Sequence, residues 1–250
     1  MADINADVII VGSGIAGALL AARLASAGAK VAILEAGQAV DREDAKQRYW
    51  SAASRQPESP YPPTPQAEHP ISDNPDYWYR QVGVDKFKST YLKVVGGTTW
   101  HWLGTCLRFV PNDFRLSSAY GRGADWPITY AELEPFYNQA EQEIGVAGDS
   151  SETLGSPRSG AYPMPAIAPT FLDKVFAQAL KGSEFVVRAT PQARNSVARG
   201  DRPACCGSAS CIPICPIQAK YDATVHVALA EKRGADLHEK TTATQIELGT

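Results

Sequence analysis

A glycine-rich turn near the amino terminus, set between an apolar run and an alanine-rich run, constrains the fold more than any other feature. Residues 8–11 (VIIV) predict a short parallel strand covered on both faces, because all four side chains are apolar. Residues 15–27 are rich in alanine and leucine and predict a helix, and Gly28 stands where helices commonly end. Residues 30–34 predict the next strand. This β-α-β unit indicates an α/β fold with a parallel, Rossmann-like sheet.

The turn has the spacing of a dinucleotide-binding fingerprint. Residues 12–17 read G-S-G-I-A-G, and an acid ends the second predicted strand. The first glycine permits the tight turn, the second lets the backbone approach a pyrophosphate, and the third allows close packing of helix on strand. The amino terminus of the helix attracts the phosphates. The predicted cofactor-binding residues here are Gly12, Ser13, Gly14, Ala16, Gly17 and Glu35.

The acid bears on which dinucleotide is bound. We expect the carboxylate of Glu35 to accept hydrogen bonds from the adenosine ribose. A carboxylate at that place repels a 2′-phosphate, so NADP is disfavoured. The fingerprint alone does not decide between FAD and NAD.

A second glycine pair favours FAD. Residues 94–102 read V-V-G-G-T-T-W-H-W. The glycines again let the backbone approach a ligand, the threonines add hydroxyl groups, and the aromatic side chains suit a planar, partly polar group such as an isoalloxazine. The predicted cofactor-binding residues of this segment are Gly96, Gly97, Thr98, Thr99, His101 and Trp102.

These two segments, together with residues 125–146 (DWPITYAELEPFYNQAEQEIGV), resemble the glucose–methanol–choline (GMC) oxidoreductases, which bind FAD. The likeness is closest to the flavoprotein subunits of bacterial gluconate 2-dehydrogenase and of FAD-dependent glucose and fructose dehydrogenases. Members of the family are roughly twice as long as this chain of 250 residues, and their catalytic histidine lies in the carboxyl-terminal half. The resemblance therefore implies that residues 1–250 are the FAD-binding portion at the front of a longer two-domain protein, with catalytic residues beyond residue 250.

The resemblance also bears on His101. In relatives that carry a covalent flavin, a histidine at this spacing after the glycine pair is bonded to the flavin, and a tryptophan follows it as Trp102 does here. Two interpretations stay open. His101 is either covalently bonded to the flavin or packs and hydrogen-bonds near it.

Residues 202–221 hold four of the five cysteines. Their spacing is C-C-x4-C-x3-C-P, and it lacks the C-x2-C pairs that zinc sites prefer. Neighbouring side chains of an extended chain point to opposite sides, so Cys205 and Cys206 can hardly serve one compact cluster. One of that pair with Cys211 and Cys215 would supply the three thiolates of a [3Fe–4S] centre. The alternative is a loop of disulfides or free thiols.

The resemblance selects among these ligands. Its iron–sulfur members use the first cysteine of the doublet and leave the second free, which implies Cys205, Cys211 and Cys215 as metal ligands. Cys106 stands alone and is expected to be a buried structural thiol.

Several further elements are expected. Seven prolines between residues 57 and 75 predict an extended arm over residues 57–90, because proline at that density excludes helix and central strand. Thr129 and Glu132 form a capping box that begins a helix ending near Gly145, with Pro135 dividing it into two shorter helices. The remaining predictions are helices at 171–180 and 223–232 and a strand at 185–189.

Composition excludes some partners. A net charge of −3 gives no electrostatic basis for binding nucleic acid, and no apolar run reaches the length of about 18 residues that spans a membrane. The residues flanking 8–24 lack the basic region of an export signal.

The resemblance implies a dehydrogenase acting on a hydroxyl of a sugar, sugar acid or polyol, passing electrons from FAD through the iron–sulfur centre to an external acceptor. It implies a small export subunit and a cytochrome c subunit as partners, which would place the protein at the periplasmic face of the inner membrane. A cytoplasmic protein is equally compatible with the sequence. The alternative function is a truncated redox module that binds FAD and the cluster without its own catalytic base.

Overall fold

The computed structural model describes residues 3–55, 60–61, 82, 84 and 92–247. Most of the predicted arm at 57–90 lies outside these residues. The chain divides into two compact units. The first unit comprises residues 1–102, 208–216 and 222–250, and the second comprises residues 103–207 and 217–221. Each unit is described by itself below.

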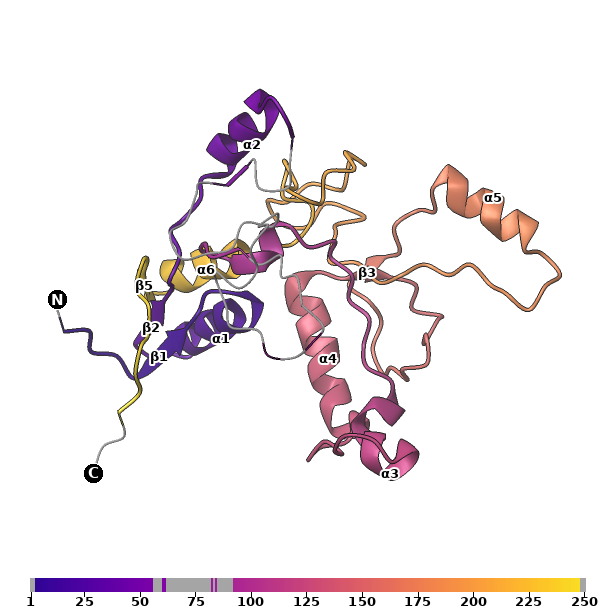
Figure 1. Cartoon of the computed structure of the whole chain (residues 1–250), viewed down its shortest axis with the longest axis horizontal. Helices are drawn as coiled ribbons and strands as arrows, with labels where there is room; N and C mark the ends of the chain where they lie inside the picture. The colour runs from indigo at the N-terminus through magenta and orange to yellow at the C-terminus, as the bar shows by residue number, and fades with distance from the viewer. Residues whose placement is uncertain (1–2, 56–59, 62–81, 83, 85–91, 248–250) are drawn as a thin grey trace. The chain divides into compact units, whose positions relative to one another are not determined.

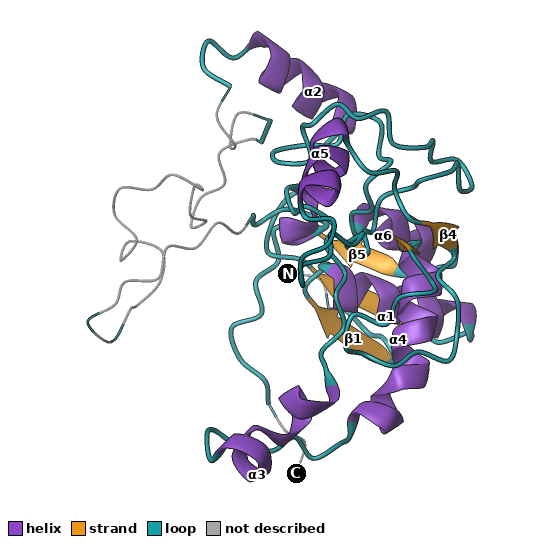
Figure 2. Ribbon diagram, turned by 90° about the vertical axis from the view of Figure 1, so that its right-hand side faces the viewer, coloured by secondary structure: helices purple, strands orange, loops and turns teal. Residues whose placement is uncertain are grey.

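A parallel sheet of three strands forms the centre of the first unit (Figure 1, Figure 2). The strand order is β1-β2-β5, and Val8 pairs with Val31 while Ala32 pairs with Asp236. Helices α1 and α6 connect and cover the strands. The bounds are β1 Val8–Val11, α1 Ile15–Ser26, β2 Val31–Leu34, α6 Thr224–Lys232 and β5 Asp236–His238. The expected β-α-β unit and α/β class are therefore confirmed, and Gly28 follows α1 with φ +88°.

Buried alanines allow helices α1 and α6 to pack closely against this sheet. Ala21, Ala22 and Ala25 of α1 and Ala230 of α6 are buried against apolar side chains of β1 and β2. Small side chains let the helix axes approach the sheet, and burial of this apolar surface stabilises the unit at roughly 25 cal/mol per Å².

One expectation for β1 is wrong. The strand was expected to be covered on both faces, but Ile9 and Val11 are 51% and 63% exposed. Among the described residues β1 pairs only with β2, and the apolar core that contains α1 and α6 buries Ile10 instead. Alternate side chains of a strand face opposite sides, so the face carrying Ile9 and Val11 stays uncovered.

A second apolar cluster lies around α2 (Arg42–Ser51) in the first unit. The carboxylate of Asp41 caps this helix by accepting from the N–H of Asp44 at 2.9 Å. Ala45 then packs with four other buried side chains, Tyr61, Val94, Trp100 and Ile214. Trp100 ends the short 3-10 helix η2 (Gly97–Trp100).

Helix α4 (Tyr130–Ile144) is the longest element of the second unit. Its predicted capping box is confirmed, since Thr129 Oγ1 accepts from the Glu132 N–H and the Glu132 carboxylate accepts from the Thr129 N–H. The expected division at Pro135 is wrong, because the helix runs through it without a break. The other elements are η3 Pro111–Arg115, α3 Leu116–Tyr120, β3 Ala147–Gly148, β4 Met164–Pro165 and α5 Phe171–Ala179.

Charged side chains hold α4 in place. Nε of Arg108 donates to Glu141 at 2.7 Å and Nη1 donates to Glu134 at 3.0 Å. Arg158 donates to the second oxygen of Glu141 at 2.7 Å, and Asn138 accepts from Arg108 Nη2 at 2.6 Å. We call these five residues the Arg108 network.

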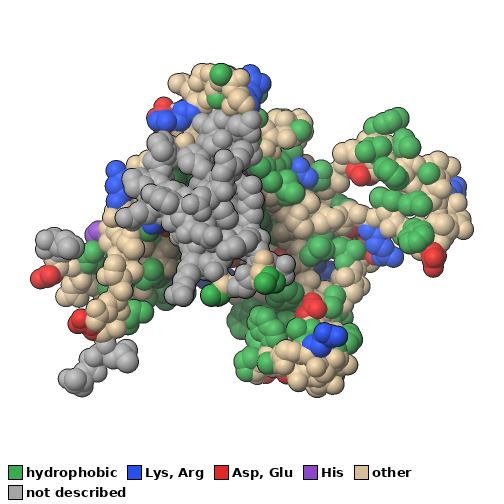
Figure 3. Space-filling view, in the orientation of Figure 1, with side chains coloured by type: hydrophobic (Ala, Val, Ile, Leu, Met, Phe, Trp, Pro, Cys, Tyr) green, Lys and Arg blue, Asp and Glu red, His purple; other side chains and the backbone are tan. Residues whose placement is uncertain are grey.

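The segment after α5 does not form the strand that was predicted at 185–189. No described residue forms a strand ladder with it, and Phe185 and Val186 are both exposed. Helix α5 itself is confirmed, and its apolar side chains also face solvent, as the green surface at the right of Figure 3 shows. A segment whose residues favour β-strands stays irregular when no neighbouring strand pairs with it.

Candidate functional site

The glycine-rich turn joins β1 to α1 with an open helix amino terminus. Gly12 has φ +94° and donates its N–H to the Leu34 carbonyl at 2.9 Å. A Cβ on Gly17 would lie 2.1 Å from the Gly12 oxygen, so only glycine fits where α1 meets the turn. At Gly14, the N-cap of α1, a Cβ would meet no described atom within 4 Å. No described side chain caps this end of α1.

An open helix amino terminus of this kind suits an anion. The first N–H groups of a helix have no partner within the helix, and their dipoles attract negative charge. The absence of an acid in the first turn keeps this field positive. The predicted pyrophosphate position beside Gly14 therefore agrees with the geometry of the turn, and Ala16 lies in that first turn.

Ser13 and Glu35 form a buried junction behind the turn. The Glu35 carboxylate accepts from the Ser13 N–H at 2.9 Å and from the Ser13 hydroxyl at 2.6 Å. Its other oxygen accepts from the Gly37 N–H at 2.8 Å. Both side chains are buried, so these contacts are shielded from solvent. A carboxylate offers about four acceptor positions, which leaves capacity for the predicted ribose contact.

The second glycine segment meets this junction. The N–H of Gly96 donates to Ser13 Oγ at 3.0 Å. A Cβ on Gly97 would lie 3.8 Å from the Cα of Gly14, so the two glycine segments lie against each other. We call Ser13, Glu35, Gly37 and Gly96 the Ser13 junction. It brings together two predicted cofactor segments that are more than 80 positions apart.

Contacts that the sequence analysis missed support the second segment from behind. Thr99 Oγ1 donates to the Gly96 carbonyl at 2.6 Å and accepts from the Ala223 N–H at 2.8 Å. A Cβ on Gly96 would lie 2.8 Å from a methyl carbon of Thr224. The start of α6 therefore fixes the conformation of Gly96. No local sequence signal at Ala223 or Thr224 points to this role.

The other predicted residues of this segment differ in burial. His101 is buried and its ring lies 6.4 Å from that of Tyr61, centroid to centroid. Trp102 is partly exposed, and Thr98 Oγ1 accepts from the Leu92 N–H at 3.3 Å. The covalent bond between His101 and a flavin stays a prediction.

The residues of the cysteine loop are divided between the two units of the chain. Cys205 and Cys206 belong to the second unit, whereas Cys211 and Cys215 belong to the first. Among the described residues, no three His, Cys, Asp or Glu side chains gather in a way that could hold a metal ion. None of the five cysteines, all of them within the described residues, forms a disulfide. Ligation of a cluster by Cys205, Cys211 and Cys215 stays a prediction.

Cys106 is only partly buried, although the sequence analysis expected a buried thiol, and its contacts are those of a structural thiol. Its Sγ lies 3.4 Å from the Gly104 carbonyl, to which it donates. Burial raises the pKa of Cys106 to about 12, so the thiol stays protonated at neutral pH. A protonated thiol is a poor nucleophile and a poor metal ligand.

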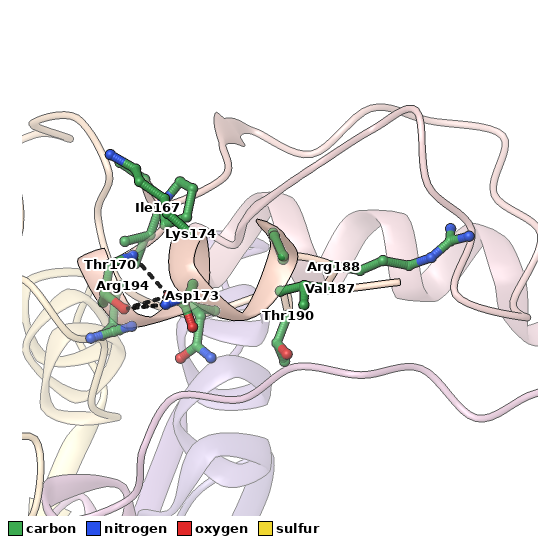
Figure 4. Close-up of a pocket in the computed structure, with 13 residues that line it drawn as sticks. Ile167, Thr170, Asp173, Lys174, Val187, Arg188, Thr190 and Arg194 are labelled. Carbon is green, nitrogen blue, oxygen red and sulfur yellow. Dashed lines mark hydrogen bonds between the residues drawn. The ribbon is translucent and has the colours of Figure 1, made fainter. Parts of the chain in front are cut away.

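A cavity of about 340 Å³ in the second unit contains none of the predicted site residues. It lies between α5 and residues 187–194, and Thr170, Lys174, Thr190 and Arg194 are among the residues that line it (Figure 4). Arg188 is directed away from Thr170 in this view and pairs with Glu152. Asp173 accepts from the Thr170 N–H at 2.8 Å, so its carboxylate serves as a helix cap.

Within the described residues, every helix is too short or too polar to cross a lipid bilayer.

The glycine turn lies in a region that matches a known protein family. Residues 7–59 match the family described as FAD binding domain. The chain is similar to the fructose dehydrogenase large subunit of Gluconobacter japonicus, with 40% identity over 250 aligned residues that cover 94% of this chain and 45% of that protein.

Two further relatives have related names. The 2-methyl-1,2-propanediol dehydrogenase of Mycolicibacterium austroafricanum is 33% identical over 187 residues, covering 70% of this chain and 30% of that protein. The gluconate 2-dehydrogenase flavoprotein of Pantoea cypripedii is 27% identical over 231 residues, covering 76% and 35%. The chain thus spans less than half the length of these relatives. Its amino-terminal region matches an FAD-binding domain, and the α/β fold with a parallel sheet agrees with that match.

Proposed function

We propose that this chain is the FAD-binding portion of a GMC-type dehydrogenase that oxidises a hydroxyl group of a sugar, sugar acid or polyol. The Ser13 junction carries the proposal, because it joins the open amino terminus of α1 to the second glycine segment. The relatives supply the reaction class: their names specify fructose, gluconate and a propanediol as substrates.

The residues present fit FAD. Gly14 and the first turn of α1 would hold the pyrophosphate, and Glu35 would hold the ribose. Residues 96–101 would lie against the isoalloxazine. Bound FAD would supply a two-electron acceptor for the carbon that bears the substrate hydroxyl.

In this proposal, the residues of this chain bind FAD and orient the two glycine segments around it. The hydroxyl of Ser13 donates to the Glu35 carboxylate and accepts from the Gly96 N–H, so it links two backbone segments. Because its hydrogen is used in the bond to Glu35, this hydroxyl is not expected to donate to a ligand. Gly96 and Gly97 have φ of +90° and +57°, a conformation that side chains other than glycine adopt at a cost. The hydrogen bond from the Ala223 N–H, at the start of α6, to Thr99 Oγ1 helps to keep this left-handed backbone in place. The site is therefore preorganised before any ligand arrives.

Oxidation of a hydroxyl also needs a base to accept the hydroxyl proton. We assign that role to no residue of this chain and expect it in the carboxyl-terminal half of the full-length protein. The alternative, a module that binds FAD without its own base, is separated from the dehydrogenase by activity of the full-length protein. We would use a sugar and sugar-acid panel with an artificial electron acceptor. Binding of FAD with no oxidation of any substrate would favour the module.

The iron–sulfur part of the proposal rests on cysteine spacing and family resemblance. Ligation by Cys205, Cys211 and Cys215 is proposed for the full-length protein, together with a small export subunit, a cytochrome c subunit and a periplasmic location. Iron and acid-labile sulfide measured on anaerobically purified full-length protein test this part. The absence of iron and sulfide from that preparation would contradict it.

Two glycines at opposite ends of α1 test FAD binding. Gly14 has φ −64° and room for a Cβ within the protein, so Gly14→Ala should leave stability unchanged. The added methyl group would stand where the pyrophosphate approaches, and we expect FAD affinity to fall about tenfold or more. The measurement is quenching of flavin fluorescence on titration of the protein, alongside thermal unfolding.

Gly28→Ala is the matched control. Gly28 has φ +88° at the far end of α1, so alanine there should lower the free energy of unfolding by about 1 kcal/mol and leave FAD affinity unchanged. Equal FAD affinity in Gly14→Ala and the wild type would overturn the placement of the cofactor.

A further inference from the structure

Arg42 makes three contacts in the first unit that the proposed function does not use. It begins α2, and its side chain is 17% exposed. Its Nη1 donates to the Cys215 carbonyl at 3.0 Å, and its Nη2 donates to the Asp222 carboxylate at 2.6 Å. Its guanidinium carbon lies 4.3 Å from the centroid of the Trp100 ring. We call Arg42, Trp100, Asp222 and Cys215 the Arg42 junction.

Two of these contacts attach Arg42 to the second glycine segment. Trp100 belongs to that segment and is buried, with its Nε1 donating to the Val95 carbonyl at 2.8 Å. Asp222 is 1% exposed, and the residue after it donates its N–H to Thr99 Oγ1. A shift of the guanidinium would therefore disturb residues 95–100 from two sides.

The third contact attaches Arg42 to the part of the cysteine loop within the first unit. Ile214 is buried and packs in the same apolar cluster as Ala45 and Trp100. The hydroxyl of Tyr61 donates to the Pro213 carbonyl. Burial raises the pKa of Tyr61 far above its ordinary value, so this hydroxyl remains a donor. Residues 213–215 are thus held by one hydrogen bond from each of two side chains.

We propose that Arg42 is a positioning residue that couples residues 208–216 of the cysteine loop to the flavin-facing segment 96–101. The coupling rests on the proposed function, since it takes FAD as the ligand of that segment. Arginine suits the role because its planar group offers two donors in a fixed fork and a face that stacks on an aromatic ring. Lysine offers a single charged point and cannot make all three contacts together.

Coupling of this kind is reciprocal. A ligand that orders the segment containing Trp100 should also order residues 208–216, and the effect should depend on Arg42. The N–H of Ile214 donates to the Ser210 carbonyl at 2.9 Å, so this amide reports opening of the loop by hydrogen exchange.

The experiment compares Arg42→Lys with Arg48→Lys by hydrogen–deuterium exchange of the full chain. Arg48 is an exposed arginine of the same helix and serves as the matched control. Without FAD, exchange in a peptide covering residues 208–216 should be about tenfold faster in Arg42→Lys than in Arg48→Lys, the ratio expected for loss of one charge-assisted hydrogen bond. A peptide from α4 in the second unit should exchange equally in both. Equal exchange of residues 208–216 in the two variants would overturn the proposal.

Addition of FAD then separates the coupling from the proposed function. In the wild type, FAD should slow exchange of residues 208–216 about tenfold, and in Arg42→Lys by less than about twofold. Bound FAD that leaves this exchange unchanged in the wild type would refute the coupling and leave the proposed function intact. Failure of the wild type to bind FAD would refute the proposed function, and the flavin-free comparison would still decide whether Arg42 holds the loop.

A second variant keeps the proposal testable if Arg42→Lys does not fold. Arg42→Lys could leave the buried Asp222 carboxylate poorly paired, so the double variant Arg42→Met with Asp222→Asn removes both charges together. It should fold and show the same fast exchange of residues 208–216. Slow, wild-type-like exchange in the folded double variant would contradict the role of Arg42.

Discussion

The Ser13 junction and the Arg108 network are both buried and polar, yet they differ in what they leave available. In the Arg108 network, charged groups satisfy one another. Both oxygens of Glu141 accept from arginines, and Arg108 donates to four side chains of α4. In the Ser13 junction, the partners are mainly backbone N–H groups, and the nearby helix amino terminus has no cap among the described side chains.

This is the difference expected between a structural polar cluster and the proposed binding site. A closed ion network stabilises the packing of α4 and has little left to offer a ligand. An uncapped helix terminus beside two glycine segments offers unsatisfied donors and free space. Residual hydrogen-bonding capacity, more than burial or charge, therefore distinguishes the proposed FAD site from the Arg108 network.

The largest expected change in stability concerns the Arg108 network. Arg108→Met should lower the free energy of unfolding by about 3–5 kcal/mol, because it removes the main cation of the buried Glu141 carboxylate and the cation that pairs with Glu134. Denaturant unfolding gives this value, and Arg115→Met, at an exposed arginine, is the control. FAD affinity of the folded fraction should not change. A loss of FAD affinity in folded Arg108→Met protein would remove the distinction between the two clusters.

The next prediction tests the Ser13 junction, where we expect a smaller loss of stability together with a loss of FAD affinity. Ser13→Ala leaves the Gly96 N–H without its acceptor and removes one hydrogen bond to Glu35, which should cost about 1–3 kcal/mol. Because the two glycine segments lose their link, FAD affinity should fall about tenfold. Flavin fluorescence and thermal unfolding measure the two quantities.

Ser183→Ala, at an exposed serine that donates to a backbone carbonyl of the same turn, provides the comparison for Ser13→Ala. It should change neither stability nor FAD affinity appreciably. Unchanged FAD affinity in Ser13→Ala would show that the junction is as purely structural as the Arg108 network.

How much of this could be predicted from sequence depends on how local each signal is. The turn at residues 12–17 and the capping box of Thr129 with Glu132 were predictable, because a few neighbouring residues determine each geometry. The sequence predicted that the two glycine segments bind the same cofactor. Its actual atoms, Ser13 Oγ and the Gly96 N–H, depend on chain packing.

The failures concern features that depend on distant partners. The strand at 185–189 has suitable residues but no described partner, and β1 has an apolar face that no described element covers. Arg42 and Asp222 are 180 positions apart, so no spacing rule could join them. The ligand set of Cys205, Cys211 and Cys215 was predicted from spacing together with the family resemblance, and it stays a proposal for the full-length protein.

The smallest effect concerns pH and returns to the Arg108 network. Partial burial raises the pKa of Glu134, but hydrogen bonds from Ser159 and Arg108 outweigh it and lower the pKa to about 2. A carboxyl group whose pKa is lower in the folded state than in the unfolded state stabilises the fold above its unfolded pKa, and this contribution is lost as pH falls through the folded value. The stability of the wild type should therefore fall between about pH 4.5 and pH 2. Glu134 is close to the surface, so we expect its share to be only about 1–2 kcal/mol.

Glu134→Gln isolates that share, because glutamine cannot titrate. Chemical unfolding at several pH values should show a shallower decline for Glu134→Gln than for the wild type over this interval. Glu132→Gln is a demanding control, since hydrogen bonds from Thr129 also lower the pKa of that exposed carboxyl group in the same helix. If the network is a closed structural cluster, FAD affinity should be the same in the wild type and in Glu134→Gln at neutral pH. A pH-dependent difference in FAD affinity between them would show that the network reaches the binding site, and the contrast between the two clusters would then fail.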